Sequence, residues 1–146
     1  MHHNPRKRFG QNFLIDQQII AQLINEIHPQ KGDRVVEIGP GLGALTRPLL
    51  QVVDHLNVVE IDRDIVAKLE KEFPQEKLTI HATDALKFDF SVLGERLRII
   101  GNLPYNISTP LLFHLSQFSE QILDMHFMLQ KEVVERMVGM PSTSDY

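Results

Sequence analysis

Residues 102–105 (Asn-Leu-Pro-Tyr) bring a side-chain amide, a rigid proline and an aromatic ring together within four positions. Pro104 fixes its own φ and favours an extended Leu103, so the Asn102 side chain and the Leu103 carbonyl can converge on one amine. Tyr105 offers a ring on which a nucleobase can stack, an interaction worth about 1–3 kcal/mol per base. A turn with a buried tyrosine is the alternative. The combination favours a site that receives an aromatic amine.

A glycine-rich segment at residues 37–43 (Glu-Ile-Gly-Pro-Gly-Leu-Gly) follows a strongly apolar run typical of a buried strand. Its spacing differs from the Gly-x-Gly-x-x-Gly of dinucleotide sites, and no Gly-Lys-Ser or Gly-Lys-Thr follows for a phosphate loop. Gly39 and Gly41 would let a ligand approach the backbone closely. A tight turn explains the glycines alone equally well.

Two acidic positions have the spacing expected of a nucleoside site. Glu60 ends the next apolar run, about twenty residues after Gly39, where a carboxylate is well placed to accept hydrogen bonds from ribose hydroxyls. Asp62 is the weaker candidate, because it could instead cap the following helix. Asp84 follows a third apolar run, where it could accept a hydrogen bond from an adenine amino group. Together with the glycines, these carboxylates predict a nucleoside-containing ligand.

Hydrophobic periodicity predicts alternating strands and helices along the chain. Strands are expected over 34–38, 56–61, 78–81, 97–100 and 124–129, and helices around 19–27 (capped by Asp16), 45–50, 65–73, 111–115 and 133–137. Such alternation implies parallel strands joined by right-handed crossovers, in a doubly wound α/β sheet covered on both faces. Ligands of these sheets bind beyond the carboxyl ends of the strands, where all the segments described above fall.

The composition is that of an ordinary globular chain of 146 residues, 42% hydrophobic and 23% charged, which predicts one domain. The absence of Cys excludes thiolate zinc sites and cysteine nucleophiles, and the seven His show no metal-ligand spacing, so no metal is expected. Apolar runs are too short to span a bilayer, and the first residues lack the apolar stretch of a secretory signal. A cytoplasmic protein is expected.

The formal net charge of −4 argues against a chain that is basic throughout and coats nucleic acid. Its distribution is uneven, because Arg6, Lys7 and Arg8 form a basic arm before an acidic body. Such a run is often only a solvated terminus. Contact with an RNA backbone is the alternative that we expect here, since the arm adjoins the motif described next.

The motifs together resemble the KsgA-type small-subunit ribosomal RNA adenine dimethyltransferases. The resemblance rests on residues 8–14 (Arg-Phe-Gly-Gln-Asn-Phe-Leu), 37–43, 60–62 (Glu-Ile-Asp), 102–109 (Asn-Leu-Pro-Tyr-Asn-Ile-Ser-Thr) and 130–134 (Gln-Lys-Glu-Val-Val), and it spans essentially the whole chain. Erythromycin-resistance methylases of large-subunit rRNA and mitochondrial transcription-factor relatives share much of this set. The basic arm and the leucine of Asn-Leu-Pro-Tyr are more similar to the small-subunit enzymes.

This resemblance implies a Rossmann-like methyltransferase fold with S-adenosylmethionine as its cofactor. The cofactor-binding positions that it implies are Gln11, Asn12, Leu14, Gly39, Gly41, Glu60, Asp84 and Asn102. Asn102, Leu103, Pro104 and Tyr105 would present the target adenine, and Arg6, Lys7 and Arg8 would contact RNA. The implied reaction is N6,N6-dimethylation of two adjacent adenosines in the 3′-terminal hairpin of 16S rRNA, on immature small subunits.

Residues 1–15 are expected to form the basic arm and cofactor-entrance segment, and residues 16–146 a truncated methyltransferase domain. Members of the family continue for roughly another hundred residues, the size of a small domain. The chain is therefore expected to lack the last strands, a Phe-x-Pro-x-Pro-Lys-Val segment opposite Tyr105, and a helical domain. Two functions stay open: the catalytic core of an RNA methyltransferase, expected to be monomeric, or a module that only binds cofactor or ribosome.

Overall fold

The computed structural model describes residues 17–129, and the arm, the cofactor-entrance positions Gln11, Asn12 and Leu14, the Asp16 cap and the helix expected near 133–137 lie outside them. The elements are α2 (Gln17–Ile27), β1 (Arg34–Ile38), α3 (Thr46–Leu50), β2 (Leu56–Val59), α4 (Arg63–Glu72), β3 (Leu78–His81), the short 3-10 helix η2 (Phe90–Leu93), β4 (Leu97–Leu103), α5 (Tyr105–Ser116) and β5 (Ile122–Leu129). Helices and strands alternate as predicted.

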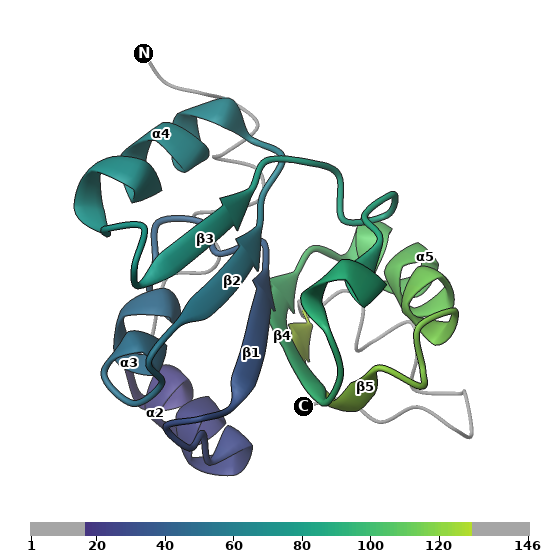
Figure 1. Cartoon of the computed structure of the whole chain (residues 1–146), viewed down its shortest axis with the longest axis horizontal. Coiled ribbons are helices and arrows are strands. Elements are labelled where there is room, and N and C mark those ends of the chain that lie inside the picture. The colour runs from purple at the N-terminus through teal and green to yellow at the C-terminus, as the bar shows by residue number, and fades with distance from the viewer. Residues whose placement is uncertain (1–16, 130–146) are drawn as a thin grey trace.

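All five strands are parallel, in the order β3-β2-β1-β4-β5 (Figure 1). The chain builds outward from β1 through β2 to β3, then returns to the other side of β1 with β4. The strand order therefore reverses between β1 and β4, and a crevice for ligands is expected at such a switch point. Val35, Val36 and Ile38 of the central strand are almost fully buried, because both of its faces are covered.

Helices cover both faces of the sheet (Figure 1). On one face, α2, α3 and α4 pack their apolar stripes against strand residues; this core contains Ile20, Leu23, Ile27, Val35, Leu45, Leu49, Val53, Leu56, Val58, Ile65, Leu69, Leu78 and Ile100. On the other face lie α5, η2 and the preceding loop; that core contains Val36, Ile38, Val59, Ala85, Phe90, Leu97, Ile99, Leu103, Leu111, Leu115 and Phe127. The doubly wound architecture predicted from the sequence is confirmed.

Three strand boundaries differ from the prediction. β2 ends at Val59, because the chain leaves the sheet after Glu60 and Ile61 is 64% exposed. β4 continues to Leu103 instead of ending at residue 100, since it pairs with β5 as far as Leu103 opposite Leu129. β5 begins at Ile122, two residues early. Strand pairing, which local sequence does not encode, sets all these ends.

Helix α4 begins where a short side chain satisfies its first amides. Asp62 Oδ1 accepts hydrogen bonds from the backbone N–H groups of Asp64 at 2.8 Å and Ile65 at 3.2 Å, so the capping alternative for Asp62 is confirmed. Among residues 17–129, no helix has the length and apolar character needed to cross a bilayer.

Candidate functional site

The carboxyl ends of three neighbouring strands bring separate motifs to one level. Ile38 of β1 pairs with Val59 of β2 and with Gly101 of β4. The next residues along these strands are Gly39, Glu60 and Asn102, so they sit side by side at the edge of the sheet. A Cβ built on Gly39 would lie 4.0 Å from the Asn102 carbonyl oxygen.

Glycine at position 101 allows this close approach. A Cβ there would come within 2.9 Å of the Ile38 carbonyl oxygen, which is closer than real side chains pack. Any larger residue would therefore push β4 away from β1 at the point where the ligand crevice opens. Sequence analysis gave Gly101 no role, and its position directly before Asn102 was the only available signal.

The glycine loop after β1 depends on backbone conformations that favour glycine. Gly39, Gly41 and Gly43 have φ values of 68°, 58° and 95°, in the region that side chains with a Cβ rarely adopt. A Cβ on Gly41 would meet nothing within 4 Å, so the loop presents open space there. The loop is thus both a tight turn, closed by Gly43 N–H to Pro40 O at 3.0 Å, and an accessible backbone surface.

Arg47 of α3 braces this loop from the side. Its Nη2 donates to the Leu42 carbonyl at 2.9 Å, while Nε and Nη2 donate to the Glu72 carboxylate of α4 at 2.6 and 2.8 Å. The Arg47 guanidinium therefore connects the glycine loop to α4 as well as to its own helix, α3. Residues 25 positions apart form this contact, which local sequence spacing does not reveal.

Glu60 is only 8% exposed at the end of β2 and accepts a hydrogen bond from the Asp62 amide at 2.9 Å. Burial raises the pKa of its carboxyl group above the usual value, and the nearby Asp62 charge raises it further. The backbone amides of Asp62, Gly41 and Ile61 act in the opposite direction. Glu60 therefore faces the glycine loop through Gly41.

Glu37, the first residue of the glycine-rich segment, is a second buried carboxyl group that sequence analysis left without a role. It is 2% exposed on β1, and Thr46 Oγ1 donates to its Oε1 at 2.6 Å. Burial raises its pKa to about 7, Thr46 opposes the rise, and the charge of Glu60 adds to it. The available signal was an acid inside a run of Val and Ile.

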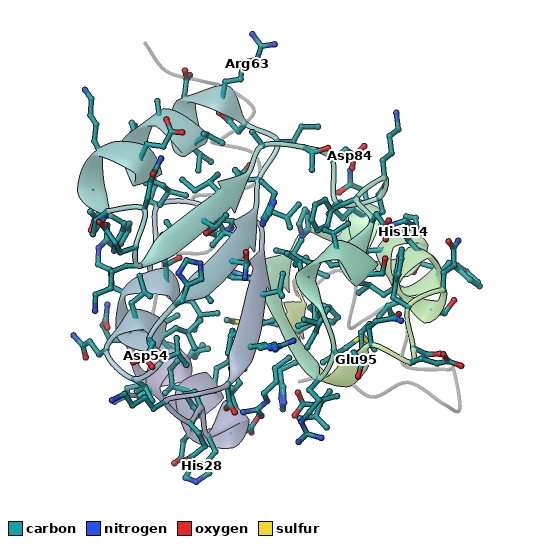
Figure 2. All side chains as sticks on the ribbon, viewed as in Figure 1. His28, Asp54, Arg63, Asp84, Glu95 and His114 are labelled. Atoms are coloured by element: carbon teal, nitrogen blue, oxygen red, sulfur yellow. The ribbon has the colours of Figure 1, made fainter. Side chains whose placement is uncertain are left out.

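Asp84 lies in the loop after β3, half-buried, with its Oδ1 accepting from the Leu86 amide at 2.9 Å. One carboxylate oxygen is therefore committed to shaping the loop. Figure 2 shows Asp84 toward the same end of the molecule as Arg63 at the start of α4, and away from His28 and Asp54. Ile61, next to Glu60, has an exposed apolar side chain that a ligand can contact. Sequence analysis did not single out this residue.

The segment 102–105 spans the end of β4 and the start of α5. Asn102 is half-buried, whereas Leu103 is 1% exposed and its side chain packs in the core. Pro104 has an extended conformation (φ −69°, ψ 154°) and precedes Tyr105, the first residue of α5. The structure thus places Asn102 beside the glycine loop; the roles of the four residues stay predictions.

No cluster of three or more His, Asp or Glu within residues 17–129 is arranged to hold a metal ion. What the described region offers is a glycine loop, two buried carboxyl groups and an amide, all at the switch point of a parallel sheet. An open α/β sheet with this edge is the architecture of Rossmann-like methyltransferases, and solved structures of that class match the chain.

A crystal structure of the 23S rRNA methyltransferase ErmE superposes with a TM-score of 0.74 at 23% identity, covering 87% of this chain and 51% of that chain. A dimethyladenosine transferase from Plasmodium falciparum superposes with a TM-score of 0.69 at 30% identity, covering 91% of this chain and 48% of that one. The predicted Rossmann-like methyltransferase fold is confirmed.

Sequence comparison then gives the family. The family described as "Ribosomal RNA adenine dimethylase" matches residues 2–146, and the chain belongs to it. The chain is 70% identical over 146 residues to "Ribosomal RNA small subunit methyltransferase A" of Nitrosomonas europaea, and 69% identical over 144 residues to the protein of that name from Thiobacillus denitrificans. These matches cover 100% and 99% of this chain but 56% of each relative, so the chain spans little more than half of their length.

Proposed function

We propose that this chain carries the cofactor site and adenine-presenting corner of a 16S rRNA adenine-N6,N6-dimethyltransferase that uses S-adenosylmethionine. The observation that carries the proposal is the alignment of Gly39, Glu60 and Asn102 on three adjacent strand ends. A ligand at this edge can meet an open backbone, a carboxylate and an amide together. The high identity to proteins named small-subunit rRNA methyltransferases supports the substrate class.

The residues at this edge fit S-adenosylmethionine. Glu37 and Glu60 are buried near each other, and the groups within residues 17–129 that shift the pKa of either one include no cation. S-adenosylmethionine carries a sulfonium and an ammonium group, so its positive charge would relieve the unfavourable burial of these carboxylates. The open backbone at Gly41 would admit it, Glu60 would accept from ribose hydroxyls, and Asp84 and Ile61 would lie at its adenine.

When bound, the cofactor supplies a methyl group on a positively charged sulfur. The side-chain oxygen of Asn102 and the carbonyl of Leu103 would each accept one hydrogen of the target adenine amine. That amine is a weak nucleophile because its lone pair is delocalised into the ring, and two acceptors favour a pyramidal nitrogen. Held in this way, the amine would receive the methyl group that the cofactor supplies, and its proton would then leave to water. Positioning of this kind can supply several kcal/mol.

The target adenosine has to leave its base stack to reach this corner, at a cost of a few kcal/mol. Tyr105, the last residue of the segment 102–105 and the first of α5, would offset part of that cost by stacking on the base. Sequence order alone supports this assignment. We propose immature small subunits as the partner and the cytoplasm as the place of reaction, with the protein acting as a monomer.

Asn102→Ala tests the adenine-presenting role. Because Asn102 would hold the amine in the transition state, we expect turnover on immature small subunits to fall far more than S-adenosylmethionine affinity, by about 100-fold against about threefold. Calorimetry measures the affinity, and methyl transfer by the full-length protein measures turnover. Asn106→Ala, an exposed position on α5, is the matched control. Equal losses in affinity and turnover would contradict the role.

The same assays on the 146-residue chain separate the two functions that the sequence leaves open. Methyl transfer by the chain supports a catalytic core, and binding without transfer supports a module that only holds the cofactor. Methylation of large-subunit rRNA instead would indicate the resistance-type specificity. Failure to bind S-adenosylmethionine at all would overturn the proposed cofactor site.

The basic arm gives a separate test of RNA contact. Replacing Arg6, Lys7 and Arg8 together by Ala should weaken rRNA binding. The slope of log affinity against log salt concentration should become less steep, by the amount expected for the loss of about two to three phosphate contacts. Binding to a 3′-terminal hairpin RNA, measured across a series of salt concentrations, gives the slope. Lys68→Ala on the exposed face of α4 is the control. An unchanged slope would contradict a contact between the arm and phosphates.

A further inference from the structure

The loop that carries Asp84 crosses from one face of the sheet to the other between β3 and η2. Asp84 organises its first turn, because the Leu86 amide donates to its Oδ1 at 2.9 Å and the Lys87 amide to its carbonyl at 2.9 Å. These contacts are local. Ala85, Leu86 and Phe88 pack the loop against the core on the α5 face of the sheet, and Phe88 adds ring contacts and a hydrogen bond.

Phe88 contacts the rest of the protein through both its ring and its carbonyl group. Its ring lies 4.9 Å from the His81 ring at the end of β3 and 4.9 Å, edge to face, from the Phe90 ring of η2. Its carbonyl oxygen lies 2.7 Å from Nε2 of His114 on α5. Because a carbonyl can only accept, Nε2 of His114 must carry the hydrogen of this bond.

His114 is itself held in place by aromatic neighbours. Its ring centroid lies 5.2 Å from that of Phe118 and 6.0 Å from that of Phe90. The imidazole is therefore wedged between the end of α5 and η2, with its Nε2 aimed at the loop. Figure 2 shows His114 on α5, on the same side of the sheet as Asp84.

The same helix starts at the other half of the proposed site. α5 begins at Tyr105, the last residue of the segment 102–105, and reaches Ser116. Leu111 and Leu115 of α5 are fully buried against the sheet, so the helix is a rigid connection between the two regions. One end of α5 continues directly from the residues proposed to hold the target base. His114, near the other end, donates a hydrogen bond to the loop proposed to contact the cofactor.

We infer that His114 is a positioning residue that fixes the Asp84 loop against α5 through its hydrogen bond to the Phe88 carbonyl. This inference rests on the proposed function, because it gives His114 the task of keeping Asp84 at the cofactor adenine. The bond would set the distance between the cofactor and target-base regions. His114 touches neither substrate nor cofactor itself.

Two substitutions of His114 separate the hydrogen bond from side-chain bulk. In His114→Gln the side-chain nitrogen reaches about as far as Nε2 and keeps a donor for the Phe88 carbonyl. In His114→Asn it reaches only as far as Nδ1 and the donor is lost. His55→Asn is the matched control, because it removes the contact of His55 Nε2 with Thr79 Oγ1 at 2.7 Å, and His55 lies before β2 at the opposite end of the sheet.

Two readouts apply to the folded variants, whose melting curves identify any that have lost the fold. Calorimetry with S-adenosylmethionine should show about tenfold weaker binding for His114→Asn, and binding within about twofold of the original for His114→Gln and His55→Asn. Amide hydrogen exchange should show faster exchange at Leu86 and Lys87 in His114→Asn alone. Gln and Asn variants that behave alike in both assays would overturn the inference.

The two readouts also separate this inference from the proposed function. If the unsubstituted chain fails to bind S-adenosylmethionine, the proposed cofactor site is wrong, and the exchange rates at Leu86 and Lys87 still decide whether His114 holds the loop. If the unsubstituted chain binds and His114→Asn binds equally well with unchanged exchange, the positioning role is wrong and the cofactor site stands.

Discussion

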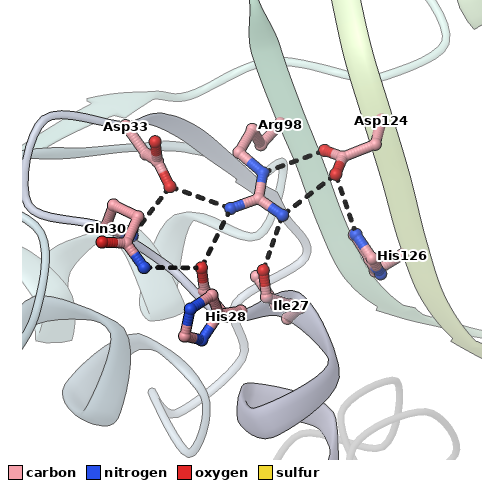
Figure 3. A network of polar contacts seen from close by, with 7 residues as sticks. All are labelled: Ile27, His28, Gln30, Asp33, Arg98, Asp124 and His126. Atoms are coloured by element: carbon pink, nitrogen blue, oxygen red, sulfur yellow. Dashed lines mark hydrogen bonds and ion pairs between the residues drawn. The ribbon is translucent and has the colours of Figure 1, made fainter.

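The two ends of the sheet bury charge in opposite ways. At the amino end, Arg98 of β4 is 9% exposed and donates to Asp33 at 2.8 Å and Asp124 at 2.9 Å (Figure 3). It also donates to the carbonyls of Ile27, at 2.6 Å, and His28, at the end of α2. At the carboxyl end, Glu37 and Glu60 are 2% and 8% exposed, and no cation in the described part of the chain contributes to the pKa of either one.

This difference separates a structural charge from charges available to a ligand. A buried ion is costly unless partners within the fold compensate it, and Arg98 has two carboxylates and two carbonyls that do so. Among residues 17–129, the carboxyl groups of Glu37 and Glu60 are compensated by Thr46 and by backbone amides and not by a cation, and burial raises their pKa values. At the amino end the buried charge is therefore paired within the fold. At the carboxyl end the buried carboxyl groups can still be stabilised by a positively charged ligand.

Removing Arg98 should have the largest effect on stability. We expect Arg98→Met to lower the free energy of unfolding by about 3–5 kcal/mol, because two partly buried carboxylates and two carbonyls would lose their donor. Chemical denaturation measures the change. Arg63→Met, at an exposed position on α4, is the control and should change stability by less than about 0.5 kcal/mol.

A second variant sharpens the same prediction. If charge imbalance causes the loss, adding Asp124→Asn to Arg98→Met should recover part of it, because a carboxylate that has lost its Arg98 partner is removed. An Arg98→Met protein as stable as the original would show that the network contributes nothing and would remove the contrast between the two ends.

Glu37→Gln should have the opposite sign and a pH dependence. The folded pKa of Glu37, about 7, lies above its ordinary value of 4.5, so the folded state binds the proton more tightly than the unfolded chain. Its contribution is therefore fully present below about pH 4.5 and is lost as pH rises to 7. The loss amounts to about 3 kcal/mol, and the glutamine variant escapes it.

Denaturation of both proteins at pH 5 and pH 8 checks this effect. We expect the glutamine variant to be more stable than the original at pH 8, with the difference shrinking toward pH 5. Glu70→Gln, on the exposed face of α4, is the matched control and should show no such change. Parallel pH profiles for Glu37→Gln and the original would mean that Glu37 is not held by burial in its protonated form.

Arg47→Lys should have the smallest effect. The Arg47 and Glu72 side chains are 48% and 41% exposed, so their ion pair is worth about 0.2–1 kcal/mol and weakens in salt. Lysine cannot reproduce the fork that also holds the Leu42 carbonyl, but water can replace its bonds there. Denaturation at low and high salt measures the change. A loss above about 2 kcal/mol would show that the glycine loop needs this brace to fold.

Local sequence patterns were enough to predict much of the fold and part of the candidate site. Strand and helix alternation followed from periodicity, the Asp62 cap from a short acidic side chain before an apolar helix, and the glycine loop from spacing. The end of β4 could not be predicted, because Asn102 and Leu103 extend the strand only through pairing with Met128 and Leu129 of β5. His114 and Arg47 were missed for the same reason, since their partners are 26 and 25 residues away.

The sequence by itself determined the local elements and motifs, because short-range sterics and periodicity set them. These are the α/β alternation, the glycine loop, the carboxylates after successive strands and the Asn-Leu-Pro-Tyr segment. Only the tertiary structure decided their neighbours. Placing β1 between β2 and β4 sets Glu60 and Asn102 on either side of Gly39 and buries Glu37, while the amino end gathers Asp33 and Asp124 around Arg98. Strand order and burial arise from contacts between distant residues, and those contacts decide which charges are paired.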